Sequence, residues 1–160
     1  MISVQILAVG KVKDTWMRQG CEEYCKRLGI WSRVTVTEVD EFRLPDSPSK
    51  AQIADCIEKE GKRILEKVRK NSRLIALCIE GKPFSSEQLA SWITTSSAQG
   101  ASSLTLVIGG SYGLSDEVKT RASLMLSMSK MTFPHQLARV LLLEQIYRAF
   151  SINAHAKYHK

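Results

Sequence analysis

Several signatures of common protein classes are missing from this 160-residue chain. No apolar run approaches the roughly 20 residues that a membrane-spanning helix needs, so we expect no membrane protein. The first residues, MISVQILAVGKVKD, carry their charges after the apolar run, which is the reverse of a secretory signal. Neither G-x-G-x-x-G after the first strand nor G-x-x-x-x-G-K-[ST] is present, which argues against NAD and ATP as ligands. We therefore expect a cytoplasmic protein without these phosphate-binding loops.

The cysteines also lack a metal-binding pattern. Cys21, Cys25, Cys56 and Cys78 contain no C-x-x-C pair, and no histidine lies near them to complete a ligand set. A structural zinc site usually draws on two such pairs. Cys21 and Cys25 stand four residues apart in a helical pattern, so they are expected to share its buried face. We predict no metal site and four reduced cysteines, as is usual in the cytosol.

Alternating strand and helix patterns run through the whole chain. The content of 44% hydrophobic and 24% charged residues is that of an ordinary globular protein, and the length suits one domain, residues 1–160. The order predicts an α/β fold with a mostly parallel sheet flanked by helices. The expected strands are Ile2–Val9, Arg33–Val39, Leu74–Ile79, Leu104–Ile108 and Leu124–Met128. The expected helices run from Asp14 to Leu28, from Ser49 to Val68, from Ser85 to Gln99, briefly after Ser115, and from Gln136 to Phe150.

The last of these helices is apolar around nearly its whole circumference. Such a helix must be buried on every side, which a small α/β domain seldom achieves alone. We therefore expect a second copy of the chain to cover it in a homodimer, and charges at Leu141 and Ile146 to disrupt that dimer. Arg139 interrupts the apolar surface and should pair with Glu144 of the partner subunit or with an RNA phosphate. His135, which follows Pro134, is interpreted as an N-terminal cap residue.

Three strand ends are candidates for a binding pocket, because ligands of such sheets bind beyond the carboxyl ends of the strands. They are Leu77–Gly81, Ile108–Gly113 and Met128–Phe133. Glycines at Gly109 and Gly110 allow the backbone to approach a ligand closely, although a glycine pair alone is more often a tight turn. A Ser-His-Asp hydrolase with Ser111 as its nucleophile is a weaker alternative. A pocket that grips a flat cofactor through its backbone favours S-adenosyl-L-methionine.

The charge of the chain favours a polyanionic partner. The formal net charge is +7, and from Ser129 onward five basic residues face the single acidic residue Glu144. A basic protein can be merely soluble, but charge gathered on the segment with all three histidines points to nucleic acid.

Long motifs in the second half of the chain resemble the RlmH family. They are LCIEGKPFSSEQLA, LVIGGSYGLSDEV, LSMSKMTFPHQLARVLLLEQIYRAFSI and the closing YHK. The resemblance extends from AVGK in the first strand to the last residue. It implies a SPOUT-class methyltransferase that transfers a methyl group to N3 of a pseudouridine in 23S large-subunit ribosomal RNA. It further implies that the enzyme acts on the assembled ribosome.

The resemblance also implies structural features that no periodicity reveals. The final helix is threaded through a C-terminal trefoil knot, and two subunits pack together to complete the site. The cofactor S-adenosyl-L-methionine is held by the knot loops. The positions that match the cofactor-binding residues of the family are Leu77, Gly109, Met128, Ser129, Lys130, Met131, Thr132 and Phe133.

The end of the chain supplies the candidate catalytic residues, Arg148, Tyr158 and His159. N3 of the base must lose its proton during methyl transfer, so a positioned base would assist. His159 is the first candidate and Tyr158 the second, while Arg148 or Lys160 could hold a phosphate or stabilise the developing anion. Two alternatives stay open: an RNA-binding module without chemistry, which would bind no cofactor, and a SPOUT enzyme acting on transfer RNA.

Overall fold

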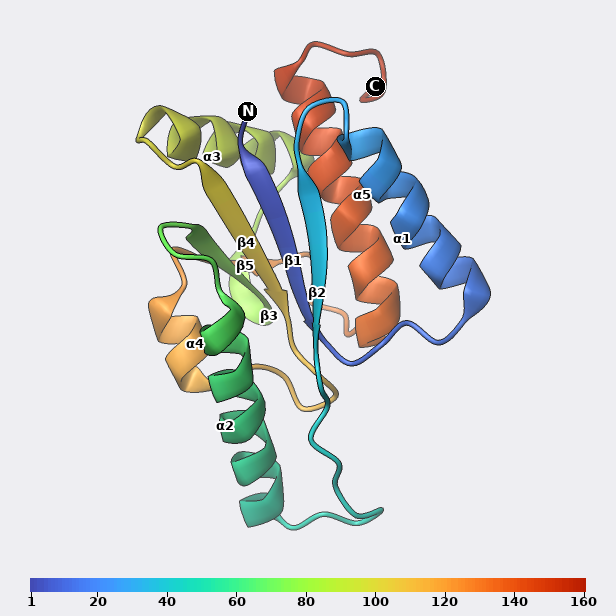
Figure 1. Cartoon of the computed structure of the whole chain (residues 1–160), viewed down its shortest axis with the longest axis vertical. Helices are drawn as coiled ribbons and strands as arrows, with labels where there is room; N and C mark the ends of the chain where they lie inside the picture. The colour runs from blue at the N-terminus through green and yellow to red at the C-terminus, as the bar shows by residue number, and fades with distance from the viewer.

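A computed structural model describes all residues, 1–160, as a five-stranded parallel sheet between two layers of helices (Figure 1). The strand order is β2-β1-β4-β3-β5. The strands are β1 (Ser3–Val9), β2 (Val34–Val39), β3 (Arg73–Pro83), β4 (Ser103–Ile108) and β5 (Leu124–Ser127). The helices are α1 (Thr15–Leu28), α2 (Lys50–Lys67), α3 (Ser86–Ala98), α4 (Asp116–Arg121) and α5 (His135–Asn153). The predicted fold class and order of elements are confirmed.

Local sequence signals account for the element boundaries. Ser49 and Ser85 each begin a helix with a complete capping box, in which the serine hydroxyl and a glutamine three residues later exchange hydrogen bonds with the backbone. Asp14 stands at the expected cap position of α1, but its side chain makes no cap hydrogen bond. β4 is buried along its whole length, as expected for a central strand covered on both faces.

Each face of the sheet has its own hydrophobic core. α1, α3 and α5 cover one face, where nineteen buried residues form the larger core. α2 and α4 cover the other face over a smaller core of nine residues, which includes Ile64 and Val118. At about 25 cal/mol for each Å² of apolar surface buried, the larger core supplies most of the hydrophobic stabilisation.

α5 is covered by its own chain more completely than its sequence pattern suggested. It lies between α1 and α3 against the sheet, and Leu142, Leu143 and Ile146 have no exposed surface. The expectation that a second copy is the main cover of this helix is therefore wrong, because two neighbouring helices and the sheet already bury three of its sides. The homodimer itself stays a prediction. A charge at Ile146 would disrupt this core and would not report on a dimer. Leu141, which is half-buried, stays a candidate contact.

β3 contains a bulge that the sequence did not predict. Leu77 and Lys82 both align with Leu126 of β5, so the residues between them leave the regular ladder. Gly81 allows this close approach, because a Cβ atom there would lie 2.7 Å from backbone atoms of Met125. The strand then continues to Pro83, beyond its predicted end at Ile79. The bulge places Cys78 to Glu80 at the edge of the sheet where the other strand ends meet.

None of the five helices combines the length and the apolar content of a membrane-spanning segment. The carboxyl ends of the parallel strands and the beginning of α5 lie at one end of the sheet, and the C-terminal tail lies at the other (Figure 1). α5 connects the two ends, and its 19 residues extend about 28 Å.

Candidate active site

A cavity of about 780 Å³ opens where three strand ends meet. The β3 bulge, the loop after β4 and the segment between β5 and α5 form its walls. Twenty residues line it, and ten of them are hydrophobic. The volume lies within the range of small-molecule pockets, roughly 300–1,000 Å³. The predicted convergence of Leu77–Gly81, Ile108–Gly113 and Met128–Phe133 is confirmed.

The loop after β4 has no room for a side chain at Gly109. A Cβ atom there would lie 2.8 Å from the carbonyl carbon of Gly113, closer than real Cβ atoms approach backbone. Gly113 has φ +86°, and its N–H donates to the carbonyl of Gly110 at 3.1 Å, which closes a tight turn. The glycines therefore let two backbone segments pack together at the pocket wall.

The segment before α5 is organised by serine side chains. The Ser127 hydroxyl donates to the carbonyl of Ser129 at 3.0 Å, and the Ser129 hydroxyl accepts from the N–H of Met131 at 3.0 Å. Of the predicted cofactor positions, Leu77, Gly109, Met128, Ser129, Met131, Thr132 and Phe133 line the cavity. Lys130 is exposed and is not among the lining residues.

Two interpretations of single residues at the start of α5 are wrong. The N-cap of α5 is Pro134, and His135 is the first helical residue, with its side chain at the cavity. Arg139 is buried within its own chain, which leaves its guanidinium inaccessible to Glu144 of the partner subunit or to phosphate. Its guanidinium contacts Glu38 of its own chain at 3.1 Å and donates to the carbonyl of Gly10 at 3.0 Å. Sequence spacing could not reveal these partners, because they lie more than 100 residues away.

The cavity contains one ion pair in an otherwise uncharged wall. Lys119 of α4 contacts Glu80 of the β3 bulge at 2.5 Å. The hydrogen bond between them lowers the pKa of the Glu80 carboxyl and raises the pKa of the Lys119 ammonium, so both groups are charged at neutral pH. No sequence pattern points to Lys119, and the sequence indicates Glu80 only as part of a strand end. No cluster of three or more potential metal ligands occurs in the structure.

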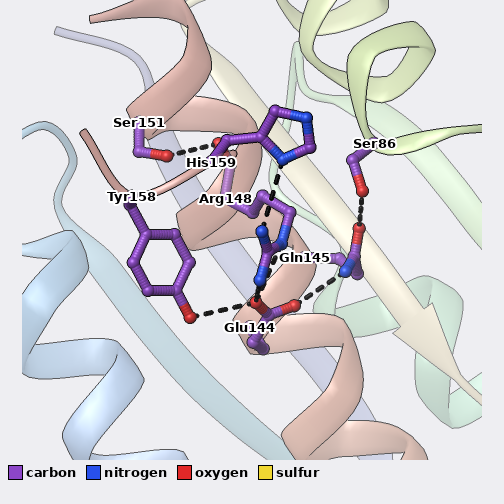
Figure 2. Close-up of polar contacts among 7 residues, drawn as sticks. All are labelled: Ser86, Glu144, Gln145, Arg148, Ser151, Tyr158 and His159. Carbon is purple, nitrogen blue, oxygen red and sulfur yellow. Dashed lines mark hydrogen bonds and ion pairs between the residues drawn. The ribbon is translucent and has the colours of Figure 1, made fainter. Parts of the chain in front are cut away.

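The predicted catalytic residues form a separate cluster near the end of α5 (Figure 2). Glu144 is its centre, and one oxygen accepts from Arg148 Nη2 at 2.5 Å and from the Tyr158 hydroxyl at 3.1 Å. His159 lies between Arg148 Nη1, 3.3 Å from its Nδ1, and Glu87 Oε1, 2.7 Å from its Nε2. The spacing of four residues between Glu144 and Arg148 was the available signal for their ion pair.

The surroundings of Tyr158 do not suit a general base. Burial, followed by hydrogen bonding to Tyr24 and Glu144, raises the pKa of the Tyr158 hydroxyl well above its ordinary value. The hydroxyl donates to Glu144, and its ring packs edge-on against Tyr147 at 4.6 Å between centroids. In this arrangement Tyr158 fixes the tail on α5, and His159 is the better placed titratable group.

Within one chain, the cluster and the cavity do not meet. The side chains of Arg148, Tyr158 and His159 are absent from the cavity lining, which reaches along α5 only to Ala138. Ala138 and Arg148 are separated by ten residues of helix, about 15 Å. A reaction that used both regions would therefore require a second chain or a rearranged tail.

Comparison with known proteins settles the family. Residues 2–159 match a family model described as "Predicted SPOUT methyltransferase". The chain belongs to the SPOUT methyltransferase family. A relative from Bifidobacterium animalis subsp. lactis, named ribosomal RNA large subunit methyltransferase H, is 50% identical over 99% of this chain and all of the relative. A protein of the same name from Carboxydothermus hydrogenoformans is 47% identical over the same shares.

Solved structures agree with this family at the level of the fold. A probable methylase family protein from Haemophilus influenzae gives a TM-score of 0.55 at 13% identity, over 99% of this chain and 71% of that one. A methylase family protein from Neisseria gonorrhoeae gives 0.52 at 12% identity, over 98% and 95%. The SPOUT fold class inferred from the motifs is thus confirmed, and the path of the trefoil knot stays a prediction.

Proposed function

We propose that this SPOUT methyltransferase uses S-adenosyl-L-methionine to methylate N3 of a pseudouridine in 23S large-subunit ribosomal RNA, acting on assembled ribosomes. The observation that carries the proposal is the full-length similarity to proteins named ribosomal RNA large subunit methyltransferase H, at 45–50% identity. The basic character of the chain, with a formal net charge of +7, supports an RNA substrate.

The cavity fits the proposed cofactor. Its volume suits a nucleoside with a short side chain, and its apolar wall from Leu77, Ile108 and Phe133 suits a flat base. Gly109 keeps the loop backbone at the pocket surface, where amide groups can contact the ligand. Bound there, the cofactor supplies an electrophilic methyl group. The chain itself contributes the orientation of that group and the exclusion of water.

We further propose a cytoplasmic homodimer in which each chain forms one domain. Ile79, Tyr112 and Met131 line the cavity and are 49%, 44% and 75% exposed, so apolar surface surrounds its mouth. Such surface favours contact with another protein. A second copy could cover it and bring its own tail to the cavity, which would overcome the separation within one chain.

In this arrangement the partner's tail acts on the target base. The partner's His159 would take the N3 proton once its contact with Glu87 is released. The partner's Arg148, held by Glu144, would stabilise negative charge on the base carbonyls. The partner's Tyr158 would hold the tail in place, which agrees with the raised pKa of its hydroxyl.

The function is tested by mapping methyl groups in RNA from a strain that lacks the gene. Loss of one N3-methylpseudouridine from 23S RNA, restored by the parental gene, is the expected result. Purified protein should methylate ribosomes from that strain but not naked 23S RNA. A missing methyl group in transfer RNA, with ribosomal RNA unchanged, would contradict the proposal, and so would absence of any change.

The shared site is tested by mixing two inactive variants. One variant carries Gly109→Val and keeps its tail, and the other lacks residues 157–160 and keeps its cavity. Mixed dimers contain one intact cavity beside one intact tail from the other chain, so activity should return on mixing. Mixing each variant with itself is the control. If mixing restores no activity although the mixed dimer forms, the tail serves its own chain.

A further inference from the structure

Glu80 and Lys119 are the only residues lining the cavity that carry a full charge at neutral pH, apart from the titratable His135. They come from different elements, the β3 bulge and α4, and meet at 2.5 Å. Their side chains are 54% and 24% exposed, so both charged ends remain accessible beside their mutual contact. An ion pair this exposed contributes little to stability.

The backbone holds both residues in place. Glu80 lies in the bulge between Leu77 and Lys82, where Gly81 packs directly on the backbone of Met125. α4 is fixed at its first turn, because a Cβ atom on Gly61 of α2 would lie 2.3 Å from the Ser115 hydroxyl oxygen. Neither support leaves space for a larger residue. The two charges therefore project from rigid elements, as a binding site requires.

Both groups have binding capacity beyond their mutual contact. The Lys119 ammonium has three donors, and Glu80 uses one of them. The Glu80 carboxylate has about four acceptor sites on its two oxygens. A ligand with a carboxylate and an ammonium side by side could add one hydrogen bond to each partner without breaking the pair.

We propose that Glu80 and Lys119 bind the zwitterionic amino-acid end of S-adenosyl-L-methionine, Glu80 its α-ammonium and Lys119 its α-carboxylate. This inference rests on the proposed function. A ribose diol would need only an acceptor such as Glu80 and would give Lys119 no role. The α-amino acid is the part of the ligand that carries both signs of charge, and it matches the pair in sign, number and proximity.

The test is calorimetry of the full-length protein with two ligands. One ligand is S-adenosyl-L-homocysteine, which retains the amino-acid end, and the other is 5′-methylthioadenosine, which lacks it. The variants are Glu80→Gln, Lys119→Met and the charge swap Glu80→Lys with Lys119→Glu. The control carries Glu58→Gln and Lys62→Gln, an exposed ion pair of α2 outside the cavity. Circular dichroism melts establish that each variant is folded.

Each single variant should bind S-adenosyl-L-homocysteine about tenfold more weakly, while its affinity for 5′-methylthioadenosine stays within about twofold of the parent. The charge swap should also lose affinity, because it retains an internal ion pair but reverses its polarity toward the ligand. Parental affinity in the swap would show that the pair only supports the wall, and this would overturn the proposal. Equal losses for both ligands would place the contact at the nucleoside and overturn it as well.

Failure of the proposed function looks different in the same experiment. In that case the parent itself would bind neither ligand nor S-adenosyl-L-methionine. If the parent binds all three and the variants behave like the parent, only the assignment of Glu80 and Lys119 is wrong.

Discussion

The regions at the two ends of α5 differ in composition: one is a cavity walled mainly by backbone and apolar surface, and the other is a network of polar side chains. At its beginning, glycine backbone, small side chains and apolar surface form a cavity with one ion pair. At its end, Glu144, Arg148, Tyr158 and His159 form a network of charged and polar side chains. The first region is shaped to receive a ligand, and the second is arranged to hold and move charge. One rigid helix fixes both without letting them touch.

This comparison shows why the regions differ in their tolerance of substitution. A cavity wall made of backbone loses its shape when a side chain is added at one of its glycines, whatever the chemistry of that side chain. A network made of side chains loses its hydrogen bonds and charges only when a particular functional group is removed. Variants in the two regions should therefore separate cofactor binding from catalysis.

The largest effect is expected from removing residues 157–160. This cut deletes Tyr158 and His159 but keeps the hydrogen bond from Asn153 to the Ala90 carbonyl and the one from the Ala156 N–H to Ser151. Methylation of ribosomes should fall by about 10²–10⁴-fold, while cofactor affinity persists. Single-turnover assays with calorimetry on the same preparation measure both. A truncated protein with the parental rate would show that the cluster has no part in the reaction.

The next largest effect is expected from a variant that loses cofactor binding but keeps the cluster at the end of α5. Gly109→Val should weaken cofactor binding at least about a hundredfold, because the added side chain meets the Gly113 backbone and shifts the loop. Gly100→Ala is the matched control: Gly100 has φ +92° and lies outside the cavity, so it should lose stability but not affinity. Equal affinity in Gly109→Val and the parent would mean that the ligand binds elsewhere.

A smaller effect distinguishes two residues within the tail. His159→Ala should reduce the rate by about a hundredfold, if its ring removes the proton. Tyr158→Phe should cost less than about tenfold, because it removes one hydrogen bond to Glu144 and keeps the ring contact with Tyr147. Rates measured across pH give the second readout, since only loss of the base should abolish the alkaline rise. The reverse ranking would assign the base to Tyr158.

The smallest effect concerns acid stability. Hydrogen bonds from its own backbone, from Ser85 and from His159 lower the pKa of Glu87 from 4.5 to about 2. A carboxyl whose pKa is lower in the folded state stabilises the protein above pH 4.5, and this stabilisation disappears as the pH falls toward 2. Melting temperatures of the parent and Glu87→Gln should therefore differ near neutral pH and converge in acid. A difference that is constant with pH would show that Glu87 makes no such contact.

Local patterns predicted the fold because its elements carry their own signals. The capping boxes at Ser49 and Ser85 and the buried run of β4 depend on residues a few positions apart. The strand-end rule likewise places Leu77, Gly109 and Met128 at one cavity, because the carboxyl ends of parallel strands meet at one edge of the sheet. For these features, sequence distance and spatial distance agree.

The features that local patterns did not predict have the opposite property, because residues distant in sequence lie close in space. The partners of Arg139, the ion pair of Glu80 with Lys119 and the cover of α5 by α1 and α3 all join distant segments. A helix that is apolar all round indicates burial but not by which chain. No sequence pattern predicts that Tyr158 and His159 lie against α5 of the same chain, because a short polar tail usually lacks a fixed position.

The position of β1 between β2 and β4 has a consequence for how the protein acquires its structure. β1 is paired with β2 on one side and with β4 on the other, and its Ser3 is aligned with Ser103. Half of its ladder is therefore missing until about a hundred residues have left the ribosome, and the buried contacts of Arg139 must wait longer still. Contacts so distant in sequence slow folding. The nascent chain should stay open to proteases and chaperones until synthesis is nearly complete, and then fold late as one cooperative unit.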